Sequence, residues 1–250
     1  MSTSTHPVSL VFVHGMGGTP GTFALVEPIL RARGHATVRV ENPLQSLSGD
    51  IAATTAAMDE LLTQAGRPDG PVLLVGHSYG GAVITNVGRD PRVAGLVYVA
   101  AFAPDEGETV NQIVERYPPA AASKYMLRGP DGSWRSDRSP AYWAETAFDL
   151  DPALRETIAS ERRESADRIF LEPGGRPAWA EKPSWYVVAD RDMTLVPEAQ
   201  DDMSARAGSV VYRFPGSHFT PWTQPQQVAG IVAAAADELA ARGARDTVAS

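Results

Sequence analysis

The fold is decided by the stretch Val72-Leu73-Leu74-Val75-Gly76-His77-Ser78-Tyr79-Gly80-Gly81. Its first four residues are a continuous apolar run, which is typical of a strand buried on both faces of a sheet. Residues 82–87 are compatible with a short helix that ends at Gly88. Between the two lies the pattern G-x-S-x-G, which predicts a tight turn with the Ser78 hydroxyl exposed above the sheet. A chance glycine-rich turn is the alternative, but the flanking strand and helix patterns favour a nucleophilic serine.

Composition excludes several classes of function. The chain of 250 residues is long enough for one α/β domain with a full core. With 22 basic and 30 acidic residues, its net charge of -8 argues against a nucleic-acid partner. The absence of cysteine excludes disulfides, thiolate metal sites and a cysteine nucleophile. A small-molecule substrate is the remaining expectation, and nothing in the sequence predicts an oligomeric state.

The sequence also predicts a cytoplasmic protein. The first seven residues have neither the basic nor the apolar region of a secretory signal. No apolar run approaches the length of about 20 residues that a membrane helix needs. We therefore expect no membrane partner.

Strand and helix patterns alternate along most of the chain. The expected strands are 8–13, 36–40, 72–75, 94–100, 184–189 and 210–214. The expected helices are 23–33, 82–87, 197–207, 226–241 and one that ends near 64 and is capped by Ser48 or Asp50. The first of these should become regular only near Glu27, and residues 242–250 should form a frayed tail. This alternation predicts an α/β fold with a doubly wound, mostly parallel sheet.

The segment from Pro104 onward breaks the alternation for about 80 positions, with prolines, charges and only broken helical periodicity. We therefore expect residues 1–103 and 184–250 to form the core and 104–183 to form a small helical cap. Most of its aromatic residues should only attach the cap to the core. Two of them, Tyr125 and Trp143, are candidates for the wall of a substrate pocket.

The first expected strand runs into the glycine-rich segment His14-Gly15-Met16-Gly17-Gly18. Dinucleotide binding would need a glycine at position 20, where the chain has Pro20. The other use of such a loop is an oxyanion hole, in which a backbone N–H faces the N–H that follows the nucleophile. We assign these donors to Met16 and Tyr79, and we expect His14 to hold the loop.

A serine hydroxyl needs a base within hydrogen-bond reach, and the base needs a group that fixes its tautomer. Of the five histidines, only His218 lies on a loop after a late strand, where sites of open α/β sheets lie. Asp192 fits the order serine, acid, histidine best, while Asp190 and Asp105 compete for the role of the acid. No histidine-carboxylate metal motif is present, so we expect neither a metal nor a cofactor.

Several blocks of the chain together resemble the α/β-hydrolase superfamily, and more narrowly its branch of plant methylesterases, hydroxynitrile lyases and their bacterial relatives. These blocks are 12–16, 76–80, 101–107, 177–179, 186–192 and 216–219. The likeness runs from about Val8 to Ala240 and is loose between about 110 and 175. It implies Ser78 as nucleophile, His218 as base and Asp192 as acid. It also implies oxyanion donors at Met16 and Tyr79.

Two departures from that branch decide between chemistries. The lyases that cleave cyanohydrins carry a lysine after the catalytic histidine and a threonine or asparagine after the first histidine, whereas this chain has Phe219 and Gly15. We include both residues in the expected pocket. The resemblance then favours a serine esterase acting on a small to medium, largely apolar carboxylic ester. A non-hydrolytic enzyme that uses the same residues for acid-base chemistry is the first alternative, and a ligand receptor without activity is the second.

Overall fold

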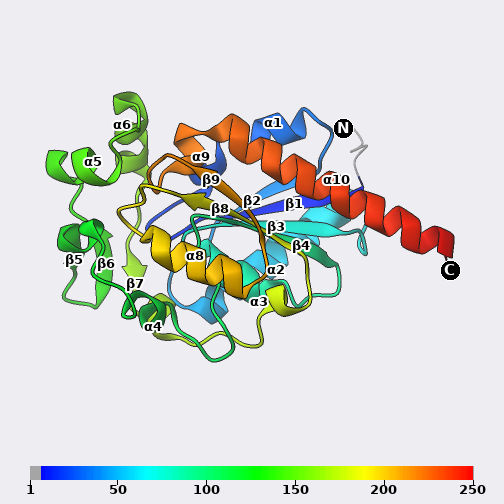
Figure 1. Cartoon of the computed structure of the whole chain (residues 1–250), viewed down its shortest axis with the longest axis horizontal. Coiled ribbons are helices and arrows are strands. Elements are labelled where there is room, and N and C mark those ends of the chain that lie inside the picture. Colours follow the sequence, from blue (N-terminus) through cyan, green and yellow to red (C-terminus); the bar gives the residue numbers. More distant parts are fainter. Residues whose placement is uncertain (1–6, 250) are drawn as a thin grey trace.

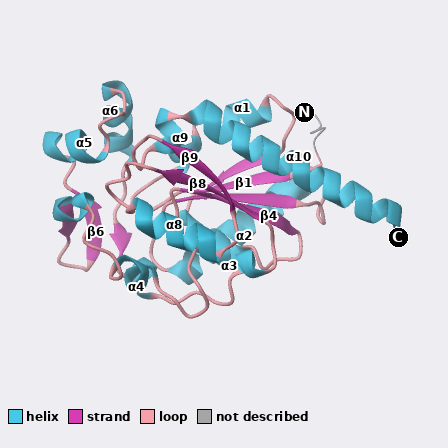
Figure 2. Cartoon of the chain, viewed as in Figure 1, coloured by secondary structure: helices cyan, strands magenta, loops and turns pink. Residues whose placement is uncertain are grey.

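The computed structural model describes residues 7–249, and its centre is a six-stranded parallel sheet (Figure 1, Figure 2). The strand order is β2-β1-β3-β4-β8-β9. The strands are β1 Ser9–Val13, β2 Thr37–Val40, β3 Val72–His77, β4 Val93–Val99, β8 Ser184–Ala189 and β9 Val210–Phe214. Because β2 and β3 lie on opposite sides of β1, the winding direction reverses between β1 and β3, where open α/β sheets form their crevices. The expected doubly wound α/β fold is confirmed.

Helices cover both faces of the sheet (Figure 1). On one face lie α1 Glu27–Arg31 and α10 Pro225–Ala249, and on the other lie α2 Leu47–Gln64, α3 Gly80–Val87 and α8 Pro197–Arg206. Two short elements, the 3-10 helix η1 Pro20–Phe23 and α9 Thr220–Thr223, border the carboxyl ends of the strands. Each face has its own apolar core, one around Met58 and Val83 and one around Leu30 and Val232. No described helix combines the length and apolar character needed to cross a bilayer.

Three helix boundaries refine the expectations from the sequence. The first helix is regular from Glu27, as expected. The cap of α2 is Ser46, whose hydroxyl accepts from the Gly49 amide at 3.0 Å, and Asp50 is instead fully buried inside the helix. The expected frayed tail is wrong, because α10 continues to Ala249. Residues 242–249 contain only one glycine and no proline, so nothing in them ends the helix.

Most of the segment predicted as a helical cap, residues 104–183, lies beyond one end of the large sheet (Figure 2), whereas residues 178–180 pack against α3. It contains four helices and two 3-10 turns, namely α4 Val110–Val114, η2 Ala121–Tyr125, α5 Pro140–Thr146, α6 Pro152–Glu161, α7 Arg168–Leu171 and η3 Ala178–Ala180. It also contains an antiparallel sheet of β5 Met126–Arg128, β6 Ser133–Ser136 and β7 Ser165–Ala166. These strands span only two to four residues and are half exposed, so their apolar pattern is too short to be recognised.

Candidate active site

Ser78 lies on the turn between β3 and α3, and its backbone has the left-handed angle φ 54°. Such a conformation is strained for any residue other than glycine and persists only where its surroundings impose it. Two glycines allow the turn: a Cβ on Gly80 would lie 2.3 Å from the Val13 carbonyl oxygen, and one on Gly76 would lie 2.7 Å from the Gly80 oxygen. The tight packing of α3 against β1 and β3 therefore fixes the position of the serine.

Gly15 lies directly against Ser78. A Cβ at this position would be 2.7 Å from the Ser78 Cβ and 3.2 Å from its Oγ. The pairing of β1 with β3 places Val13 beside Gly76, so the loop after β1 meets the elbow after β3. Gly15 thus leaves open the space around the Ser78 hydroxyl that a side chain would fill.

The two expected oxyanion donors lie on either side of this space. Met16 and Tyr79 both line the cavity over Ser78. Within residues 7–249, neither backbone N–H has a hydrogen-bond acceptor. The Tyr79 side chain points into the core, where its hydroxyl donates to Asp50 at 2.7 Å. Burial raises the pKa of Asp50, and burial together with the Asp50 charge raises the pKa of Tyr79.

His218 and Asp192 form a buried pair. The His218 Nδ1–H donates to the Asp192 Oδ2 at 2.6 Å, and both side chains are nearly inaccessible to solvent. The other carboxylate oxygen accepts from the amides of Thr194 and Leu195 at 2.7 and 2.9 Å. A carboxylate held by backbone amides in this way can fix the tautomer and orientation of the imidazole.

Gln200 on α8 completes the shell around this carboxylate and was not expected from the sequence. Its Nε2 donates to Asp192 Oδ2 at 2.9 Å and to the Leu195 carbonyl at 2.7 Å. Its Oε1 accepts from the Ala189 amide at 3.1 Å. Every polar atom of this buried side chain therefore has a partner. No short motif marks the residue, because its role depends on α8 packing beside the loop after β8.

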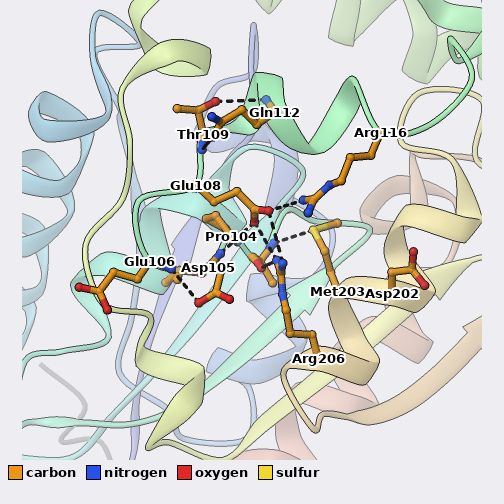
Figure 3. A network of polar contacts seen from close by, with 12 residues as sticks. Pro104, Asp105, Glu106, Glu108, Thr109, Gln112, Arg116, Asp202, Met203 and Arg206 are labelled. Carbon is orange, nitrogen blue, oxygen red and sulfur yellow. Dashed lines mark hydrogen bonds and ion pairs between the residues drawn. The ribbon is translucent and has the colours of Figure 1, made fainter.

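The two competing acids lie elsewhere. Asp190 is bound to Arg213 on the surface at 2.6 Å. Asp105 lies at the start of the inserted segment, in a network that Figure 3 shows. There its amide donates to Glu108, which also binds Arg206 at 2.8 Å. Of the three aspartates, Asp192 alone contacts a histidine.

Two further histidines near Ser78 have structural partners. His14 Nε2 accepts from the Asn42 amide at 3.2 Å, and burial lowers the pKa of His14 to about 4. His77 Nε2 donates to the His218 carbonyl oxygen at 2.9 Å, and burial, reinforced by the proximity of His218, lowers the pKa of His77. Both rings are therefore neutral at pH 7. His14 holds the loop after β1, as expected, and His77 supports the backbone of His218.

Ser78 and His218 open into one cavity of about 370 Å³ between the large sheet and the inserted segment. Gly15 and Phe219 line it, in agreement with the sequence. Its apolar wall also includes side chains that the sequence did not single out, among them Phe102, Val110, Met126, Tyr142, Ile158 and Trp222. Space of this size suits a small or medium ligand.

The pocket prediction is corrected for Trp143 and Tyr125, which lie one layer behind this wall. Trp143 packs against Phe219 and Tyr142, with ring centroids 5.9 and 5.0 Å away. Tyr125 packs edge-on against Tyr142, and its hydroxyl donates to Glu145 at 2.6 Å. The sequence marks α5 as rich in aromatic residues, but the rotation of this short helix decides which ring faces the cavity.

No group of three or more His, Cys, Asp or Glu side chains among residues 7–249 is arranged to hold a metal ion. The site thus consists of an elbow serine, a buried histidine-aspartate pair and two amides without acceptors. The serine, the histidine and the residues of both amides line one cavity, and Asp192 binds the histidine from behind that wall.

Comparison with known proteins assigns the chain to a family. The model of the alpha/beta hydrolase family matches residues 10–231, so the protein belongs to this family. "Probable hydrolase R7" of the fungus Phoma sp. is 25% identical over 225 residues, which cover 82% of this chain and 88% of the relative. A carbendazim hydrolyzing esterase of Nocardioides sp. is 31% identical over 131 residues, which cover 48% of this chain and 53% of the relative.

Solved structures share the fold. A pyrethroid hydrolase from Sphingobium faniae superposes with a TM-score of 0.76 at 22% identity, covering 92% of this chain and 98% of the other. A methylesterase from Arabidopsis superposes with a TM-score of 0.69 at 18% identity, covering 92% and 99%. These likenesses show the shared fold, and the family model confirms the expected α/β-hydrolase superfamily. The names of the relatives support the expected class, a carboxylic-ester hydrolase.

Proposed function

We propose that the protein is a serine esterase that hydrolyses a small to medium, largely apolar carboxylic ester through Ser78, His218 and Asp192. The observation that carries this proposal is the buried 2.6 Å contact between His218 and Asp192, beside a cavity that Ser78 also lines. The strained elbow and the absence of a side chain at Gly15 support the assignment of the nucleophile.

In the proposed reaction, His218 Nε2 removes the proton from Ser78 as the hydroxyl oxygen attacks the ester carbonyl. The developing oxyanion accepts hydrogen bonds from the Met16 and Tyr79 amides, each worth about 3 kcal/mol in sites of this kind. His218 then donates the proton to the leaving alcohol, and Asp192 stabilises the imidazolium throughout. Water, activated by the same histidine, releases the acid from the acyl-enzyme.

The cavity supports an ester with a largely apolar body. Phe219 and Trp222 pack together with ring centroids 5.6 Å apart and form one part of its wall. Position 219 follows the proposed base directly. Since its side chain is apolar, this position offers no ammonium group to stabilise a departing anion, which favours ester hydrolysis over cyanohydrin cleavage.

The test is hydrolysis of p-nitrophenyl esters of graded chain length by the wild-type protein and by Ser78→Ala. We expect wild-type turnover with an optimum at short or medium chains, and a loss of about 10⁴-fold or more in the variant. The thermal midpoint of the variant should match that of the wild type. Ester turnover that survives the substitution would contradict the proposal.

A further inference from the structure

Arg162 lines the same cavity and has no counter-ion there. It is the residue directly after α6, and its side chain is half-buried. Its Nη1 donates to the hydroxyl of Tyr142 at 2.9 Å. Within residues 7–249, it takes part in no ion pair, and it is the only lysine or arginine among the described residues of the cavity wall. A guanidinium carries five N–H donors, so most of its hydrogen-bonding capacity is free to serve a ligand.

The surroundings of Arg162 add positive charge. Arg138 donates to the carbonyl oxygens of Ala159 and Arg162 at 2.5 and 3.1 Å, so a second guanidinium lies behind the first. Burial lowers the pKa of Arg138, and the charges of Arg162 and Arg135 lower it further. The Glu164 carboxylate acts on the pKa of Arg138 in the opposite direction, so charges of both signs lie near the end of α6.

Two carboxylates also belong to the cavity wall, and both have other partners. Glu161 is exposed, accepts from the neutral Thr19 hydroxyl at 3.0 Å and, within residues 7–249, forms no ion pair. Asp167 forms an ion pair with Arg128 and accepts from the Trp134 ring N–H. Neither forms an ion pair with Arg162. An anionic ligand group is therefore the natural partner for this guanidinium.

The loop after β1 connects Arg162 with the reacting serine. A Cβ on Gly17 would lie 3.6 and 3.7 Å from the Nε and Nη2 atoms of Arg162, while Gly15 lies against Ser78. The Cα atoms of these two glycines can be at most about 7 Å apart. A single small molecule can thus reach from the serine to the guanidinium.

We propose that the ester substrate carries a carboxylate away from the scissile bond, and that Arg162 binds it. This inference rests on the proposed esterase function and adds an anionic subsite to a cavity that is otherwise largely apolar. The bound class would be half-esters of dicarboxylic acids, or esters of alcohols or phenols that bear a carboxylate.

Two matched substrate pairs test the proposal. On the acyl side, p-nitrophenyl hydrogen adipate is compared with its neutral methyl ester. On the alcohol side, the butyrate ester of 4-hydroxyphenylacetic acid is compared with the same ester whose carboxylate is methylated. Within at least one pair we expect kcat/KM to favour the anionic member by about tenfold or more, the size of a charge-assisted hydrogen bond. Ser78→Ala measures the background for each substrate.

Substitutions of Arg162 then test whether this residue causes the preference for the anionic substrate. In Arg162→Gln the ratio of anionic to neutral turnover should fall to about one, and Arg162→Lys should restore part of it. Arg176→Gln is the matched control, because this arginine is exposed and paired with Glu181 at 2.7 Å, outside the cavity wall. It should leave the ratio unchanged. If Arg162→Gln does not fold, loss of the wild-type preference at high salt supplies the same evidence.

The outcomes separate this inference from the proposed function. Ser78-dependent turnover of both members of both pairs at equal rates would overturn the anionic subsite and leave the esterase intact. A preference that persists in Arg162→Gln would also overturn it. Failure to hydrolyse any of the four esters above the Ser78→Ala background would instead contradict the proposed function.

Discussion

The two halves of the site are built in different ways. The proposed reacting groups, Ser78, Asp192 and His218, follow strands of the large sheet and are only 8%, 2% and 6% exposed. Much of the opposite wall comes from residues 104–183, where a small apolar cluster around Trp143 is accompanied by ion pairs between partly exposed side chains, such as Lys124 with Glu145 at 2.7 Å. Exposed ion pairs of this kind contribute about 0 to 1 kcal/mol. We therefore expect substitutions in the sheet half to affect catalysis more strongly than substitutions in the inserted half.

The largest effect within this comparison is expected from Asp192→Asn in the sheet half. The variant removes the negative charge that stabilises the His218 imidazolium, and it can present an N–H donor where the ring needs an acceptor. We expect kcat to fall by about 10³ to 10⁴-fold with little change in KM. Steady-state kinetics on a short p-nitrophenyl ester measure it.

Asp190→Asn and Asp105→Asn are the matched controls, since these carboxylates contact no histidine. Both variants should retain activity within about twofold. A large loss in either control, together with an active Asp192→Asn enzyme, would show that the acid has been misassigned.

The sheet half should also be sensitive to acid. The pKa of His14 is lowered from 6.5 to about 4, so between these values the unfolded chain binds more protons than the folded one. The contribution of His14 to the free energy of unfolding is fully present above about pH 6.5 and is lost as the pH falls towards 4. The lowered pKa of His77 acts in the same direction. We expect His14 alone to lower the free energy of unfolding by about 2 kcal/mol between pH 7 and pH 5.

Urea denaturation at the two pH values tests this prediction. His14→Gln stays neutral at both, and its side-chain oxygen can still accept from the Asn42 amide. The variant should therefore show a smaller loss of stability on acidification than the wild type. An equal loss in both proteins would mean that His14 does not drive the acid sensitivity.

A smaller effect is expected from Gln200→Met, which removes the amide that positions Asp192. We expect kcat to fall by about tenfold while KM changes little, because a hydrogen bond to a charged group contributes about 1.5 to 3 kcal/mol. Gln200→Glu should lose more than Gln200→Met, since a second carboxylate would face the first. That order of activities would not arise if Gln200 only filled space.

Lys124→Gln is the matched variant in the inserted half. It breaks an exposed ion pair and should change kcat by no more than about twofold. If the order were reversed, with Lys124→Gln more harmful than Gln200→Met, the contrast between a rigid catalytic half and a tolerant inserted half would be wrong.

The catalytic half could be predicted from the sequence because its signals are local. Gly76 and Gly80 flank Ser78 because the tight turn leaves no space for side chains at these two positions. The position of His218 after the last strand follows from the strand pattern. The structure places the predicted histidine and aspartate in direct contact, with His218 Nδ1 bound to Asp192 Oδ2. The roles of Ser78 as nucleophile, His218 as base, Asp192 as acid and the two amides as oxyanion donors remain proposals that kinetic experiments must test.

The remaining features depend on tertiary packing. Gln200 binds Asp192 only because α8 lies beside the loop after β8, and no sequence pattern records that contact. Trp143 on α5 and Tyr125 on η2 lie behind the cavity wall because they pack against Phe219 and Tyr142, and no sequence pattern predicts these contacts. Arg162 is one of many charged residues in its segment, and only the fold reveals that it lines the cavity without a carboxylate partner.

The central claim is that Ser78 is the activated nucleophile, and active-site labelling tests it most directly. The protein is treated with a fluorophosphonate, digested and analysed by mass spectrometry, with His218→Ala as a parallel sample. The account predicts one adduct, on the peptide that contains Ser78, and little labelling in the His218→Ala sample. A treated protein that has lost its esterase activity while its Ser78 remains unmodified would contradict this claim.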